Sequence, residues 1–142
     1  MACFYGYETH WLKFDVYYKL FIEESGIAGC CIGGQLFPGS SGNAPSDFAI
    51  PELLAQYGND ERPPVGYEIL NRKNFQLPFE TIKTIRFDST GTLWLGGKPN
   101  SGSVRVHMNN SRIRRFIMLG KQDSTKIRKA AQTLGYLVER EH

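Results

Sequence analysis

The chain has 142 residues and a mass of 16.1 kDa, a length that suits one domain with one ordinary core. Hydrophobic residues make up 41% of it and charged residues 22%, a balance that excludes a disordered chain, a collagen and a long coiled coil. The net charge of +3 is too small to indicate nucleic-acid binding by itself.

The first predicted elements are two strands joined by a tight turn. Apolar side chains alternate over residues 14–22, and this period of two predicts a strand. Gly26 supplies the turn, and a second strand is expected from about residue 27 to residue 37. On that strand Cys30 and Cys31 point to opposite faces, so one is a small core residue and the other a surface or second-layer thiol.

An insertion is expected over residues 38–66, between strands. It opens with the loop sequence PGSSGNAPSD, and residues 48–57 fit a short helix with Pro51 in its first turn. The stretch cannot build a core of its own, so it is not a second domain.

The second half of the chain reads as short strands separated by turns. The apolar spacing changes from three to two between Phe79 and Phe87, which predicts a helical turn or bulge before a strand that ends at Asp88. This pattern is typical of a small antiparallel sandwich or barrel. The other strands are expected over residues 67–70, 75–77, 92–95, 104–108 and 112–119.

A C-terminal helix is expected from Asp123 to Leu134. Asp123 or Ser124 can cap its N-terminus, and Gly135 is a stop signal. An apolar stripe at helical spacing must lie against an open end or edge of the strands; it consists of Ile127, Ala130, Ala131, Leu134 and Val138.

This order of elements resembles the pleckstrin-homology-like superfold, which includes the GRAM and bacterial PH families. The likeness rests on residues 18–27 as the opening hairpin, 79–87 as a helical turn leading into a strand, and 127–134 as the capping helix. The resemblance implies a mainly β fold: an antiparallel seven-stranded, partly open barrel capped by the C-terminal helix, with a short helical insertion.

The resemblance also sets the expected domain layout and function. One domain spans residues 1–142, with terminal extensions over 1–12 and 136–142. The family binds phosphoinositide headgroups or protein partners. In its lipid-binding members basic residues flank the first hairpin, whereas this hairpin carries the acidic pair Glu23 and Glu24.

The basic residues of this chain gather elsewhere. Residues 1–100 hold 8 Lys/Arg against 11 Asp/Glu, whereas residues 101–142 hold 9 against 3. We expect Arg112 and Arg114 to share one face of a strand and to project into water beside Lys126 or Lys129, where they can hold a phosphate or carboxylate. The alternative is that the charges keep a strand edge from pairing with a neighbour. The candidate ligand-binding residues are Arg105, Arg112, Arg114, Arg115, Lys121, Lys126 and Lys129.

The sequence contains no recognised enzyme motif. A nucleophile elbow, a Walker loop and a dinucleotide-binding glycine pattern are all missing, and His10, His107 and His142 have no ligand spacing. We therefore expect no catalytic residue, no metal and no cofactor. Three cysteines without a Cys-x-x-Cys pair favour free thiols. We expect a cytoplasmic protein without a signal peptide or a transmembrane segment.

Three functions stay open at this stage. The first is a non-enzymatic binding or adaptor module that recognises a protein partner or an acidic ligand such as a lipid headgroup, which includes peripheral contact with a membrane. The second is a small β-barrel that binds nucleic acid, because aromatic and basic residues together can stack bases. The third is an enzyme with an unrecognised site. A homodimer through a strand edge is compatible with all three.

Overall fold

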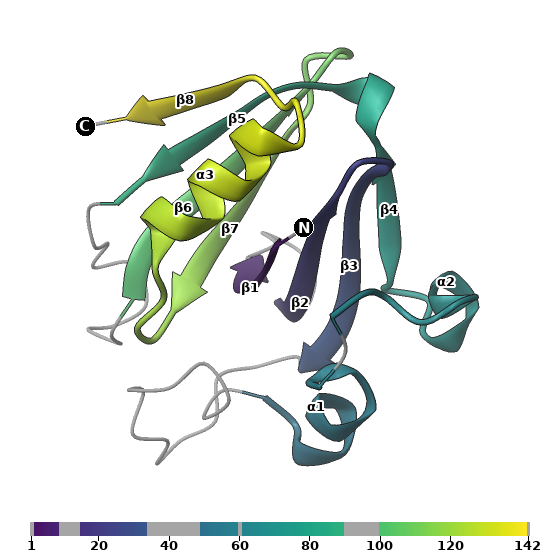
Figure 1. Ribbon diagram of the computed structural model, residues 1–142. Coiled ribbons are helices and arrows are strands. Elements are labelled where there is room, and N and C mark those ends of the chain that lie inside the picture. Colours follow the sequence, from purple (N-terminus) through teal and green to yellow (C-terminus); the bar gives the residue numbers. More distant parts are fainter. Residues whose placement is uncertain (1, 9–14, 34–48, 60, 90–99, 142) are drawn as a thin grey trace.

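A bent sheet of eight strands with a C-terminal helix on its concave side accounts for most of the described residues (Figure 1). The structure is a computed structural model that describes residues 2–8, 15–33, 49–59, 61–89 and 100–141. The strands are β1 (Ala2–Glu8), β2 (Val16–Glu23), β3 (Gly26–Gly33), β4 (Phe75–Pro78), β5 (Ile82–Asp88), β6 (Asn100–Met108), β7 (Ile113–Leu119) and β8 (Val138–Glu141). The helices are α1 (Pro51–Tyr57), α2 (Tyr67–Leu70) and α3 (Ser124–Thr133), and a 3₁₀ turn covers Phe79–Thr81.

The strand order is β4-β3-β2-β1-β7-β6-β5-β8. Neighbouring strands are antiparallel except for β8, which pairs in parallel with β5 because α3 first carries the chain back across the sheet. The expected antiparallel seven-stranded barrel is therefore corrected in three respects: the described sheet has eight strands, it is mixed, and it stays open, with β4 and β8 as its edges.

The two terminal segments are part of the sheet. Residues 1–12 were expected to be an extension, but Ala2–Glu8 form β1 between β2 and β7. The alternation of this strand is unclear in the sequence because both of its faces are covered: Phe4 belongs to the core under α3 and Tyr7 to a second core on the other face. The segment after residue 135, also expected to be an extension, supplies β8.

The inner core lies between the concave face of the sheet and α3. Its side chains come from both halves of the sheet, and Ile127 and Ala131 of α3 are buried among them. The predicted helix is confirmed at both ends. The Asp123 carboxylate accepts a hydrogen bond from the Lys126 backbone N–H at 3.1 Å, and Gly135 adopts φ 95° after the last turn.

A second core lies on the opposite face of β1, β2 and β3, under α1. The predicted short helix of the insertion is confirmed as Pro51–Tyr57, and Tyr57 is buried against the sheet. Lys19 of β2 is only 2% exposed, and its ammonium donates to the Tyr57 and Gly58 carbonyl oxygens at 2.9 and 3.0 Å. A buried cation thus satisfies the C-terminal carbonyls of α1. Cys30 lies in this core and Cys31 in the inner one, as the alternation predicts.

The stretch 67–70 is a helix, α2, and not the predicted strand. Four residues are too short for sequence periodicity to separate the two structures. Asn74 holds the segment to the sheet, since its amide accepts from the Cys31 backbone N–H at 2.7 Å and donates to the Tyr67 carbonyl oxygen at 2.8 Å. The predicted strand over 92–95, the loop 38–47 and the last residues of the predicted strand 27–37 lie outside the described residues.

Candidate functional site

The predicted basic residues do not converge on one surface. Arg105 and Arg115 lie opposite each other on β6 and β7, and Arg86 of β5 is the next partner in register. These three side chains alternate with inner-core residues, so they occupy the sheet face away from α3. Arg86 also pairs with the Glu139 carboxylate of β8 at 2.8 Å.

Arg114 lies on the inner face and not in the solvent position expected for it. Its guanidinium makes a bidentate pair with the Glu8 carboxylate at 2.6 and 2.9 Å. It also lies 3.8 Å from the centroid of the Phe75 ring, which stacks on Phe116. Arg114 therefore joins β7 to β1 and β4, and we assign it a structural role.

Four of the predicted residues are exposed, but on different elements. Arg112 lies at the turn between β6 and β7, Lys121 lies in the loop before α3, and Lys126 and Lys129 lie on α3. Of these, Lys126 lines a pocket. The candidate site is built around it.

The pocket exists because β1 and β7 separate. The two strands share one backbone pair, Tyr7 with Ile117, and beyond it the Gln122 side chain takes the place of the missing strand partner. The Tyr5 backbone N–H donates to Gln122 Oε1 at 2.8 Å, and Gln122 Nε2 donates to the Tyr5 carbonyl oxygen at 2.8 Å. This arrangement holds the start of α3 beside the first half of β1.

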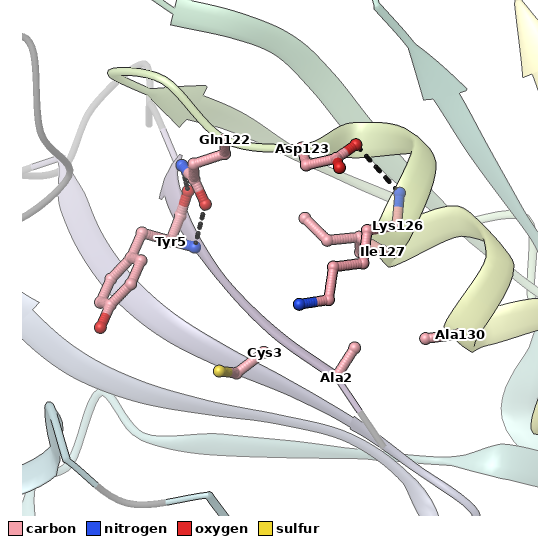
Figure 2. A pocket seen from close by; sticks show the side chains of 8 residues that line it. All are labelled: Ala2, Cys3, Tyr5, Gln122, Asp123, Lys126, Ile127 and Ala130. Atoms are coloured by element: carbon pink, nitrogen blue, oxygen red, sulfur yellow. Dashed lines mark hydrogen bonds between the residues drawn. The ribbon is translucent and has the colours of Figure 1, made fainter.

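A pocket of about 430 Å³ opens between β1 and the first turns of α3 (Figure 2). Its size lies within the usual range of small-molecule sites. In Figure 2 the Lys126 side chain reaches from α3 toward Cys3 and Tyr5 on β1. The lining residues are Ala2, Cys3, Tyr5, Gln122, Asp123, Lys126, Ile127 and Ala130.

The polar groups of the pocket differ in what they can still bind. The Gln122 amide and the Asp123 carboxylate already hold backbone groups. Among the described residues, no acceptor pairs with the Lys126 ammonium. Burial, helped by the nearby Cys3, raises the pKa of the Tyr5 hydroxyl, whose ring packs against the second core beside Tyr17.

The chain has to be interpreted from its own residues. No known family model and no curated protein matches it. Within the described ranges, no group of three or more His, Cys, Asp or Glu side chains could hold a metal ion. The helices described here are all too short or too polar to cross a membrane.

Among the pocket residues, Lys126 was predicted from the sequence to bind a ligand, whereas Cys3, Tyr5 and Gln122 were not predicted. Residues 3 and 5 belong to the segment expected to be an extension, and no periodic signal places that segment beside α3. The alternation of Arg114 with Phe116 and Met118 was, in contrast, a readable sign that this arginine faces the core.

Proposed function

We propose that this protein is a non-enzymatic binding module of the pleckstrin-homology-like type, which holds a small acidic ligand with an apolar body between β1 and α3. The observation that carries the proposal is the Lys126 ammonium at a pocket whose remaining surface is mainly apolar. Along the chain, the antiparallel strands β1 to β4 come first, the antiparallel strands β5 to β7 follow, and α3 then lies on the concave face. This order supports the assignment to the pleckstrin-homology-like type.

The pocket offers different contacts to the two parts of such a ligand. Ala2, Ile127 and Ala130 offer an aliphatic wall for an apolar body. Lys126 offers a charge-assisted hydrogen bond to a carboxylate or phosphate, whereas the Tyr5 ring packs against the second core and turns its hydroxyl away from Lys126. The Asp123 carboxylate, which caps α3 through one oxygen, also lines the pocket, so its negative charge disfavours a ligand with several charges. A monoanionic amphiphile therefore fits better than a polyanion.

The test compares octanoate with 1-octanol, which shares its chain but lacks the charge. Because Lys126 is exposed, its ion pair with the carboxylate should contribute up to about 1 kcal/mol, so octanoate should bind several-fold more tightly. Lys126→Met keeps the aliphatic stem, and it should bring the two affinities together. Lys129→Met is the matched control, because Lys129 is an exposed lysine of the same helix that does not line the pocket.

A filling variant tests the position of the apolar body. Ala130→Phe should weaken octanoate and 1-octanol equally, because the larger side chain occupies the space that both share. The proposal is wrong if octanoate binds no better than 1-octanol to the unaltered protein, or if Lys129→Met and Lys126→Met have the same effect. If octanoate binding persists in Lys126→Met and in Ala130→Phe but disappears in Arg112→Glu, the ligand lies at the β6–β7 turn instead.

A further inference from the structure

Three large aliphatic side chains stand in solvent at one corner of the molecule. Val65 is 105% exposed, Ile69 88% and Leu70 51%. All three belong to the short segment that contains α2, and we call residues 65–73 the α2 tip. In Figure 1, α2 lies at the margin of the molecule, beyond β4 and far from α3.

The backbone and one anchor residue hold the tip in this position. Gly66 adopts φ 77°, a left-handed conformation that turns the chain into α2. Tyr67 points inward and is 6% exposed in the second core, while its carbonyl oxygen accepts the Asn74 amide at 2.8 Å. With Tyr67 anchored, Ile69 lies on the opposite side of the helix and in solvent, whereas Leu70, three residues after Tyr67, is half exposed at its flank.

The charges beside the tip are mainly positive. Arg72 is exposed and Lys73 is half-buried, and both follow α2 after Asn71. Glu68 is the acidic residue within the tip, so its net charge is positive. An apolar protrusion next to basic side chains is the pattern of a segment that inserts into the interface of an anionic bilayer.

The shape and size of the tip argue against a protein partner. A stable protein interface buries about 800 Å² on each side, usually around aromatic or arginine anchors in pockets. The tip lies at the margin of the molecule and offers three aliphatic side chains without an exposed aromatic residue, which is too little for a stable dimer or complex. We propose that the α2 tip inserts Val65, Ile69 and Leu70 into an anionic lipid surface, with Arg72 and Lys73 at the level of the headgroups.

Flotation with lipid vesicles tests this proposal on the full chain. Vesicles of phosphatidylcholine with about 30 mol% phosphatidylglycerol should bind the protein, and pure phosphatidylcholine should bind it several-fold less, because the anionic surface attracts the basic residues. The double variant Val65→Ser, Ile69→Ser should lose at least tenfold in vesicle affinity. Both side chains lie in solvent, so the fold should not change, and circular dichroism checks this.

Two controls separate insertion from other causes. Leu137→Ser removes an exposed leucine near β8, 66% exposed, and should bind vesicles like the unaltered protein. Glu68→Gln removes the acidic charge of the tip and should strengthen binding to anionic vesicles. The proposal is overturned if the unaltered protein does not float with anionic vesicles, or if the tip variant and Leu137→Ser behave alike. It is also overturned if the tip variant changes only the sedimentation of the free protein, since this result indicates self-association.

Discussion

The Gln122 side-chain amide forms hydrogen bonds with both backbone groups of Tyr5, each at 2.8 Å, and so acts as a strand residue where β7 has already left β1. The same amide donates to the Leu119 carbonyl oxygen at 2.9 Å. One side chain therefore connects the end of β7, the first half of β1 and the start of α3, and these are the elements around the pocket.

Gln122→Leu should lower the free energy of unfolding by about 2 kcal/mol, because it leaves the half-buried Tyr5 N–H and C=O without partners. Urea unfolding measures the change. Gln122→Glu keeps an acceptor for the Tyr5 N–H but sets a carboxylate oxygen against the Tyr5 and Leu119 carbonyl oxygens, so it should cost at least as much at neutral pH. A loss below about 0.5 kcal/mol for Gln122→Leu, the level of an ordinary surface site, would show that water replaces the amide.

The packing of α3 makes a second prediction. Ile127→Ala should cost about 2–4 kcal/mol, since Ile127 is 5% exposed and its removal leaves a cavity in the inner core. Leu134→Ala should cost less, because Leu134 packs only partly buried against the edge of that core. Thermal or urea unfolding of both variants checks the ranking. Equal small losses would mean that α3 is not part of the cooperative core.

Stability should fall in alkaline solution. Burial raises the pKa of the Tyr18 hydroxyl to about 12, with the Glu8 carboxylate adding to the effect, whereas the ordinary value is 10.0. Burial likewise raises the pKa of Tyr136 to about 12. The folded state favours the neutral phenols, so their contribution is complete below pH 10 and is lost as the pH rises toward 12.

Urea unfolding between about pH 8 and pH 11 measures this decline. Tyr18→Phe cannot ionise at this position, so its stability should decline less steeply than that of the unaltered protein over the alkaline range. A decline with the same slope in both proteins would contradict the assignment of the effect to Tyr18.

Ligand binding should protect one cysteine. Cys3 is exposed at the pocket, whereas Cys30 and Cys31 are buried in the two cores, so a mild alkylating reagent should modify Cys3 first. Saturating octanoate should slow this modification several-fold, because the ligand covers the thiol. Mass spectrometry follows each cysteine separately, and the two buried thiols show whether unfolding contributes. Modification of Cys3 at an unchanged rate with bound octanoate would remove Cys3 from the site.

The fold was largely predictable where one periodic signal dominates. Alternation located β2, the β6–β7 hairpin and the strand that ends at Asp88, and helical spacing located α3 to within one residue at each end. β1 was not predicted because both of its faces carry core residues, which removes the contrast between apolar and polar positions. The parallel pairing of β8 depends on the direction in which α3 returns the chain, and no local pattern encodes that direction.

The site was less predictable than the fold. Arg114, which pairs with Glu8, was placed in solvent because of its charge, although its alternation with Phe116 and Met118 indicates the inner face of the sheet. The pocket brings together residues from opposite ends of the chain, Ala2 to Tyr5 and Gln122 to Ala130. Their proximity follows from the sheet order and from the Gln122 bridge, and both are tertiary features.

An NMR titration of the ¹⁵N-labelled chain with octanoate tests the central claim most directly, because it reports where the ligand lies. The backbone amides of Cys3, Tyr5, Lys126 and Ala130 should shift together in a saturable way, and Lys126→Met should need several-fold more octanoate to reach the same shifts. Saturable shifts confined to the β6–β7 turn around Arg112, or no saturable shift at all, would contradict a ligand site between β1 and α3.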